Sequence, residues 1–136
     1  MFSLKDDSFE FSKTQLKTEL IDKKKLDDDY TQLRLNFTFD FKIGSFSKDV
    51  TWSNHDIESV ASQLENLDIS DEISAIEPDI SFSYRKLEEN LYTFYINFDN
   101  GIINSNMGTD SGISLRLVVN RHSLLNWKNE LTKLLN

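Results

Sequence analysis

The chain has 136 residues, one proline, four glycines and no cysteine, with a formal net charge of −8 at pH 7. This length fits a single domain, residues 1–136, around one hydrophobic core. Without cysteine the chain can form neither a disulfide nor a cysteine-ligated metal site, and its acidity argues against nucleic acid or an anionic membrane as a partner. Because no long apolar stretch is present, we expect no signal peptide and no transmembrane helix, and therefore a cytoplasmic protein.

The first expected element in chain order is a short N-terminal hairpin, indicated by Phe2, Leu4, Phe9 and Phe11. Residues 17–29, with three lysines at 23–25 and three aspartates at 27–29, are typical of an exposed loop. The aspartates do not fit a calcium-binding EF-hand, because the twelfth position from Asp27 is Thr38 instead of a bidentate glutamate. We interpret them as a solvated turn and expect no metal.

The clearest pattern is a strict alternation of apolar and polar residues over 33–43, with Leu33, Leu35, Phe37, Phe39, Phe41 and Ile43 on one side. It predicts a long strand with one solvated face. Gly44-Ser45 suits a hairpin connection to a second strand at 46–52. Further alternating strands are expected at 80–84, 92–98 and 113–119, with a turn at 99–101. Such alternation is typical of antiparallel sheets covered on one face.

Two amphipathic helices interrupt this pattern. The first places Ile57, Val60, Ala61, Leu64 and Leu67 on one stripe, preceded by a capping-box variant formed by Ser53 and Asp56. The second, at 121–135, places Leu124, Trp127, Leu131, Leu134 and Leu135 on one stripe, with Asn120 or Ser123 as N-cap. The sequence therefore predicts an α+β fold, a largely antiparallel β-sheet (single layer or sandwich) with two amphipathic helices packed on it.

Charge is concentrated in one segment. From Asp49 to Tyr84, 36 consecutive residues contain nine acidic residues and neither Lys nor Arg, whereas the remaining 100 carry 14 acidic residues (23 minus 9) against 15 bases. Asp56 is expected to cap the helix, and Glu77 and Asp79 flank the proline before a strand. The residues left on one helix flank and in the loop after it are Glu58, Glu65, Asp68, Asp71 and Glu72. They form either a solvated surface or a binding site for a cationic partner.

Three other residues are candidates for a binding or catalytic role. Tyr95 lies on the strand face opposite to Phe94 and Ile96, so either that strand is covered on both sides or Tyr95 is exposed to a partner. The two histidines, His55 and His122, stand near the predicted helix starts and match no catalytic motif. We predict that the chain is not an enzyme, has no catalytic residue and uses no cofactor.

Short motifs carry a family resemblance: Met1-Phe2-x-Leu4, Glu77-Pro78 followed by Ile80-x-Phe82, and Leu115-x-Leu117 through Leu124-x-x-Trp127-x-x-x-Leu131. With these motifs the chain resembles the WapI-type family of small bacterial immunity proteins, which bind and neutralise the C-terminal toxin domains of polymorphic or contact-dependent toxins. The resemblance implies stoichiometric occlusion of a cognate protein toxin, without turnover.

A toxin that cuts nucleic acid is basic around its substrate groove, and an acidic surface suits such a partner. We therefore expect a contact set of Glu58, Glu65, Asp68, Asp71 and Glu72, with Tyr95 as an aromatic anchor. The alternative is a non-catalytic structural or adaptor subunit of a phage or secretion assembly, which would use a sheet edge or the face of Tyr95. The sequence leaves the oligomeric state open.

Overall fold

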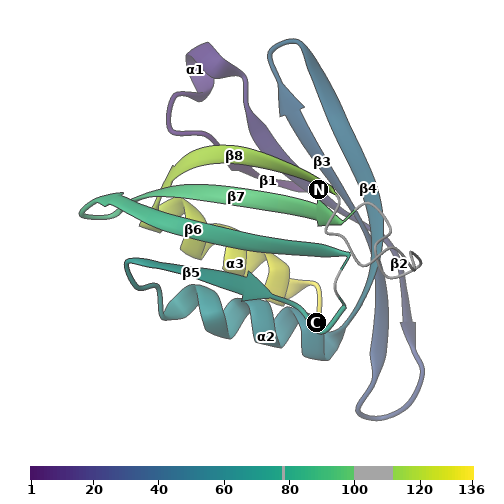
Figure 1. Ribbon diagram of the computed structural model, residues 1–136. Coiled ribbons are helices and arrows are strands. Elements are labelled where there is room, and N and C mark those ends of the chain that lie inside the picture. Colours follow the sequence, from purple (N-terminus) through teal and green to yellow (C-terminus); the bar gives the residue numbers. More distant parts are fainter. Residues whose placement is uncertain (78, 100–111) are drawn as a thin grey trace.

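The computed structural model describes residues 1–77, 79–99 and 112–136, and confirms an α+β fold (Figure 1). In chain order the elements are β1 (Phe2–Lys5), α1 (Phe9–Ser12), β2 (Gln15–Lys25), β3 (Thr31–Phe41), β4 (Gly44–Ser53), α2 (Asn54–Glu65), β5 (Ser70–Ser74), β6 (Ile80–Glu88), β7 (Leu91–Asp99), β8 (Gly112–Asn120) and α3 (Arg121–Lys133). The predicted turn at 99–101 lies largely outside the described residues, as does the proline of the Glu77-Pro78 pair.

The strands form two antiparallel sheets, each with its strands in chain order: β1-β2-β3-β4, the first sheet, and β5-β6-β7-β8, the second sheet. The strands of the two sheets run across each other in Figure 1, and one core cluster contains residues of both. Ring centroids of Phe37 and Phe82 are 6.4 Å apart, and those of Phe46 and Phe98 are 4.9 Å apart. The choice between one layer and two is therefore decided in favour of two sheets that share a core.

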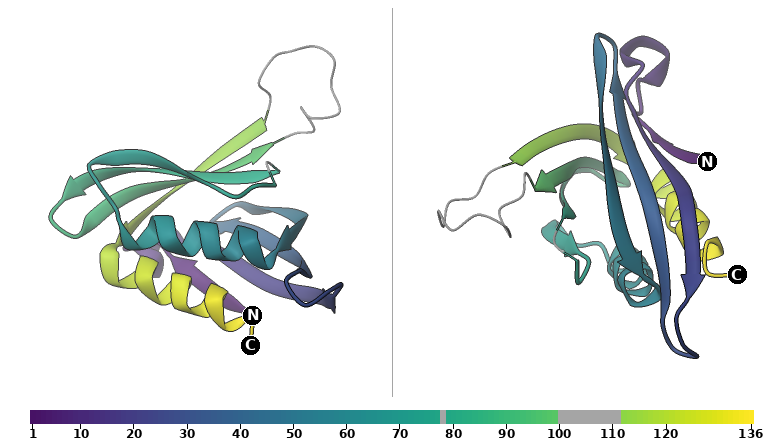
Figure 2. Two further views of the ribbon diagram at one scale, coloured as in Figure 1. Left: turned by 90° about the horizontal axis from the view of Figure 1, so that it is seen from below. Right: turned by 90° about the vertical axis from the view of Figure 1, so that its right-hand side faces the viewer.

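The two long helices join the sheets. α2 contacts the edge strands β4 and β5, α3 contacts the edge strands β1 and β8, and the helices lie side by side (Figure 2). Trp127 of α3, 1% exposed, packs edge-on against Phe82 and Phe94 of the second sheet and donates from Nε1 to Thr18 Oγ1 of the first sheet at 3.4 Å. No helix in the described part of the chain is long and apolar enough to cross a membrane.

Both predicted helix N-termini are confirmed. Ser53 caps α2: its hydroxyl accepts a hydrogen bond from the Asp56 N–H, and the Asp56 carboxylate accepts one from the Ser53 N–H in return. Asn120 caps α3 by accepting from the Ser123 N–H at 2.8 Å. These bonds satisfy backbone donors that a helix start leaves without a partner. The predicted α2 stripe is buried at Ile57, Val60, Ala61 and Leu64, whereas Leu67 lies beyond the helix and is partly buried.

The N-terminal prediction is wrong in two respects. Phe9 belongs to the short helix α1, so β1 pairs with β2 and forms no hairpin with residues 9–11. Residues 17–25, expected in a loop, belong to β2, where Leu16 and Thr18 are fully buried. The alternation was hard to recognise because a β-bulge at Ile21 shifts the register between Leu20 and Asp22. Beyond a bulge the side chains change faces, and the period of two is lost.

Two boundaries also differ from the prediction. The β3–β4 connection is Lys42-Ile43, since Phe41 already pairs with Gly44, and Ile43 is 91% exposed in this turn instead of facing the core. Residues 70–74, expected in the loop after the first helix, form β5 at the edge of the second sheet. Only Ile73 of this strand is buried, so the sequence contains too few apolar residues there to indicate a strand.

Candidate functional site

The helical part of the predicted acidic contact set, Glu58 and Glu65, lies exposed on α2. The Glu65 carboxylate accepts a hydrogen bond from Lys128 Nζ of α3 at 2.7 Å. Glu58 Oε2 lies 3.9 Å from His55 Nδ1 on the same helix. The segment contains no base of its own, but the fold supplies Lys128 from elsewhere in the chain. Glu65 is therefore partly neutralised, and Glu58 is the more available of the two.

The remaining three acidic residues, Asp68, Asp71 and Glu72, lie together where α2 ends and β5 begins; we call them the acidic edge. All three are exposed. The N–H of Asp68 donates to the Tyr84 hydroxyl at 2.8 Å, which fixes the connection between α2 and β5. Asp71 and Glu72 are consecutive strand residues, so their side chains point to opposite sides of β5.

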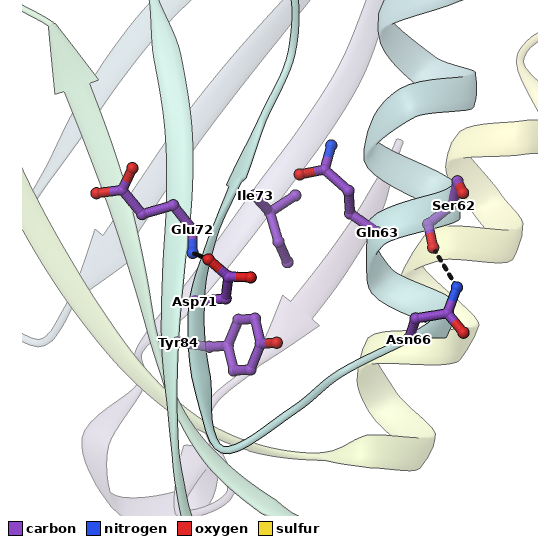
Figure 3. A pocket seen from close by; sticks show the side chains of 7 residues that line it. All are labelled: Ser62, Gln63, Asn66, Asp71, Glu72, Ile73 and Tyr84. Carbon is purple, nitrogen blue, oxygen red and sulfur yellow. Dashed lines mark hydrogen bonds between the residues drawn. The ribbon is translucent and has the colours of Figure 1, made fainter.

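A cavity of about 220 Å³ opens between α2 and β5 at this edge. The residues that line it are Ser62, Gln63, Asn66, Asp71, Glu72, Ile73 and Tyr84 (Figure 3). In Figure 3 the Glu72 carboxylate points away from α2. Asp71 is thus the carboxylate placed to act inside the cavity, and Glu72 adds negative charge at its rim.

The cavity contains acceptor oxygens that lack a donor. Asp71 Oδ1 accepts from the Glu72 N–H at 2.8 Å, and Asn66 Nδ2 donates to the Ser62 carbonyl at 3.2 Å. Within the described residues, no hydrogen bond reaches Asp71 Oδ2 or Asn66 Oδ1. Either oxygen can accept a hydrogen bond from a cation such as a lysine ammonium or an arginine guanidinium.

The same residues close the free edge of β5. Gln63 Oε1 accepts from the Ser74 N–H at 3.2 Å, and Gln63 Nε2 donates to the Ser74 carbonyl at 2.9 Å. The side-chain amide therefore pairs with this strand as a neighbouring backbone would. Together with the bond from the Glu72 N–H to Asp71, it occupies two successive outward N–H groups. A partner consequently meets side chains at β5, not an open strand edge.

The acidic residues at the other end of α2 have a structural role. Asp56 is 4% exposed, and its two carboxylate oxygens accept four hydrogen bonds, from the Ser53 N–H and hydroxyl and from the N–H groups of Ile76 and Glu77. The prediction that Asp56 caps the helix is confirmed, and Asp56 also binds the segment before β6. Loss of hydration on burial, and then the negative charges of Asp79 and Asp56, raise the pKa of Glu77.

Tyr95 lies apart from the cavity. It is half-buried on the side of the second sheet turned away from the helices, paired with Ser83 on β6 and Arg116 on β8. Glu72 pairs with Ser83 and so belongs to the same cross-strand row. Of the two possibilities left open by the sequence, the structure favours the second, because Tyr95 retains exposed surface on the face opposite to the core.

The two histidines lie in different surroundings. His55 begins α2, where its ring is 6.3 Å from that of Tyr30. His122 begins α3 and lines a second, shallower cavity of about 470 Å³ with Asn90, Asn120, Arg121 and Leu125. A hydrolase site would require a histidine, an acidic residue and a nucleophile in one pocket, and the lining of this second cavity contains no carboxylate. The absence of enzyme activity stays a prediction.

Sequence reasoning missed four polar or aromatic residues of the first cavity: Ser62, Gln63, Asn66 and Tyr84. A signal for three of them was present, since Ser62 and Asn66 are four residues apart on α2 with Gln63 beside them, away from the buried stripe. Tyr84 was expected only as the last residue of the strand at 80–84, and it is 5% exposed with its hydroxyl at the Asp68 N–H.

No family model matches the chain, and neither the curated proteins nor the solved structures contain a significant match to it.

Proposed function

We propose that the chain is an immunity protein or antitoxin that binds a cationic protein toxin and neutralises it stoichiometrically. The observation that carries this proposal is the cavity beside the acidic edge, where Asp71 Oδ2 and Asn66 Oδ1 accept no hydrogen bond within the described residues. A basic side chain of the partner would supply the missing donors. The resemblance to WapI-type immunity proteins supports the same role.

The electrostatics of the segment favour this partner class. Asp68, Asp71 and Glu72 are exposed within five residues of one another, and none of them forms an ion pair in the described part of the chain. Unscreened charges of one sign accelerate association with a partner of opposite charge. A guanidinium or ammonium group that enters the cavity would convert this attraction into short, charge-assisted hydrogen bonds.

Inhibition by occlusion needs only an interface that covers the toxin's active surface. A toxin that cleaves nucleic acid exposes basic residues around its substrate groove, and the acidic edge could cover or flank that groove. Glu58 would extend the contact along α2. Glu65 would contribute less, because Lys128 already binds its carboxylate at 2.7 Å.

A second candidate function is a structural or adaptor subunit of a phage or secretion assembly. The half-exposed Tyr95 beside Arg116, on the face away from the helices, favours this alternative. Tyrosine and arginine are both enriched in the centres of protein interfaces. Such a subunit would bind its partner without the acidic edge.

The test is a binding titration against the protein encoded immediately upstream, together with rescue of growth from that protein. The variant Asp68→Lys/Asp71→Lys/Glu72→Lys should lose both binding and rescue. The matched control Glu10→Lys/Asp22→Lys/Glu88→Lys makes the same change in net charge at exposed positions elsewhere, and should keep both.

Three outcomes separate the candidates. If the wild-type protein neither binds nor rescues, the immunity function is wrong. If the acidic-edge variant binds as tightly as the wild type and Tyr95→Ala does not, the adaptor alternative is favoured. If both charge variants weaken binding equally, net charge explains the attraction and the cavity does not.

A further inference from the structure

The second sheet has a face turned away from α2 and α3, which lie on its other side (Figure 2); we call it the outer face. Its register places Arg116 of β8 directly beside Tyr95 of β7, and Arg85 of β6 directly beside Thr93 of β7. Arg85 is therefore diagonal to Tyr95, at a spacing of about 7–8 Å. Two arginines thus flank one tyrosine, one on each neighbouring strand.

Neither arginine has a partner within the described residues. Both are exposed, and neither side chain forms an ion pair or a hydrogen bond there. Several lysines differ in this respect: Lys86 binds Glu89 at 3.2 Å, and Lys128 binds Glu65 at 2.7 Å. Positive charge is thus left unpaired in a chain whose net charge is −8.

Acidic residues near the outer face do not neutralise it. Glu72 is three strands away from Arg116 in the same row, a separation of about 14 Å at the usual strand spacing. Asp6 lies beside β8, but its carboxylate accepts hydrogen bonds from the N–H groups of Val118 and Ser8 at 2.8 and 2.9 Å. The other neighbours of Tyr95 on this face, which include Ser83, Asn97, Ser114 and Val118, carry no charge.

These polar side chains form a fixed platform. Asn97 Nδ2 donates to Ser83 Oγ at 3.3 Å, and Ser114 Oγ donates to Asn97 Oδ1 at 2.7 Å. These hydrogen bonds join residues on three adjacent strands and fix the surface beside Tyr95. A preformed surface loses little conformational entropy on binding.

We propose that the outer face is a second docking surface, which binds an acidic segment of a partner protein through Arg85, Tyr95 and Arg116. Guanidinium groups bind carboxylates in a bidentate manner, and the tyrosine supplies contact area and a hydroxyl donor. Nucleic acid is a poorer fit, because it requires an extended basic surface. This inference goes beyond the toxin-binding role, since the charge and the location of the surface both differ from those of the acidic edge.

The experiment uses an acetylated hexaglutamate peptide as probe and follows backbone amide NMR shifts of the full chain at 0.15 M salt. We expect the shifts to concentrate on β6, β7 and β8 around Thr93 and Tyr95. The variant Arg85→Glu/Arg116→Glu should bind the peptide at least about tenfold more weakly than the wild type, because the charge-assisted bonds to both guanidinium groups are lost. Arg34→Glu/Arg121→Glu, which changes the charge equally elsewhere, should bind the peptide as the wild type does.

Several results would overturn the proposal. One is a shift pattern centred on Arg121 and His122 at the start of α3. Another is equal weakening by both arginine pairs, which would indicate a response to net charge alone. Tighter binding of inorganic phosphate than of the peptide at the outer face would identify an anion site instead of a protein-docking surface. If sedimentation shows self-association that Arg85→Glu/Arg116→Glu abolishes, the occupant is a second copy of the chain.

Discussion

The two ends of α2 use the same kind of residue for opposite purposes. At the start of the helix, the Asp56 carboxylate is 4% exposed and accepts four hydrogen bonds from the chain itself. Beyond the end, the Asp71 carboxylate is exposed and accepts one, from its neighbour's N–H. Both belong to the segment that contains no base. The charge of a residue in the sequence therefore does not tell a structural carboxylate from a binding one. The two are distinguished by the number of carboxylate oxygens that accept no hydrogen bond from the chain.

Replacing Asp56 should have the largest effect on stability. Asp56→Ala leaves the N–H groups of Ser53, Ile76 and Glu77 without their acceptor and removes the helix cap, which together should cost about 3 kcal/mol. Urea unfolding monitored by circular dichroism measures this loss of stability. Glu58→Ala, at an exposed position on the same helix, serves as control and should change stability by less than about 0.5 kcal/mol. Equal losses in the two variants would contradict the distinction between the two ends of the helix.

Removing the charge of Asp71 should weaken partner binding and leave folding stability unchanged. Asp71→Asn keeps an oxygen for the Glu72 N–H, so folding stability should be unchanged, whereas binding of the cationic partner should weaken about tenfold, or about 1.4 kcal/mol. Calorimetric titration measures the binding, with Glu88→Gln, at an exposed position outside the contact set, as the control of equal charge. Unaltered affinity of Asp71→Asn would show that the cavity takes no part in binding.

Gln63 tests whether the β5 edge is closed by a side chain. Gln63→Ala removes both hydrogen bonds to Ser74 and should cost about 1 kcal/mol. The exposed edge should also promote concentration-dependent aggregation, because unpaired strand edges pair with other chains. Light scattering after thermal challenge measures the second effect, with Ser62→Ala on the neighbouring helix position as control. A soluble Gln63→Ala protein of unchanged stability would indicate that the edge is protected otherwise.

Local signals explain what could be predicted from the sequence. The alternation from Leu33 to Phe41 and the Ser53–Asp56 capping box depend on residues close together in the chain, and both are confirmed. β2 was missed because the bulge at Ile21 breaks its period, and β5 because Ile73 is its only buried residue. The cavity could not be predicted, since it requires the register of Tyr84 against Asp71 and the approach of α2 to β5.

The pairing of charges also depends on residues that are far apart in the chain and could not be predicted from the sequence. The neighbour that neutralises Glu65, Lys128, is 63 residues away in the chain. A double-mutant cycle on Glu65→Gln and Lys128→Met should give a coupling energy of about 0.5 kcal/mol, because the glutamate side chain is well exposed to solvent. The cycle Glu58→Gln with Lys128→Met is the control and should give none. A coupling near zero for both pairs would return Glu65 to the set of acidic residues available to a partner.

The smallest expected effect concerns Glu77, at the protected end of the helix. Burial and the charges of Asp79 and Asp56 raise its pKa in the folded state, so its protonated form is the one that folding favours. Its contribution to stability is present below its unfolded pKa of about 4.3 and is lost as the pH rises through the folded value. Glu77→Gln should therefore raise the Tm slightly at pH 7 and leave it unchanged at pH 3.

Glu10→Gln, at an exposed position of α1, is the matched control, and thermal scans at both pH values measure the difference. A lower Tm for Glu77→Gln at pH 7 would mean that the ionised carboxylate is bound by a donor, as that of Asp56 is. Both carboxylates at the start of α2 would then be bound within the chain, and the contrast with Asp71 beyond the other end would be sharper.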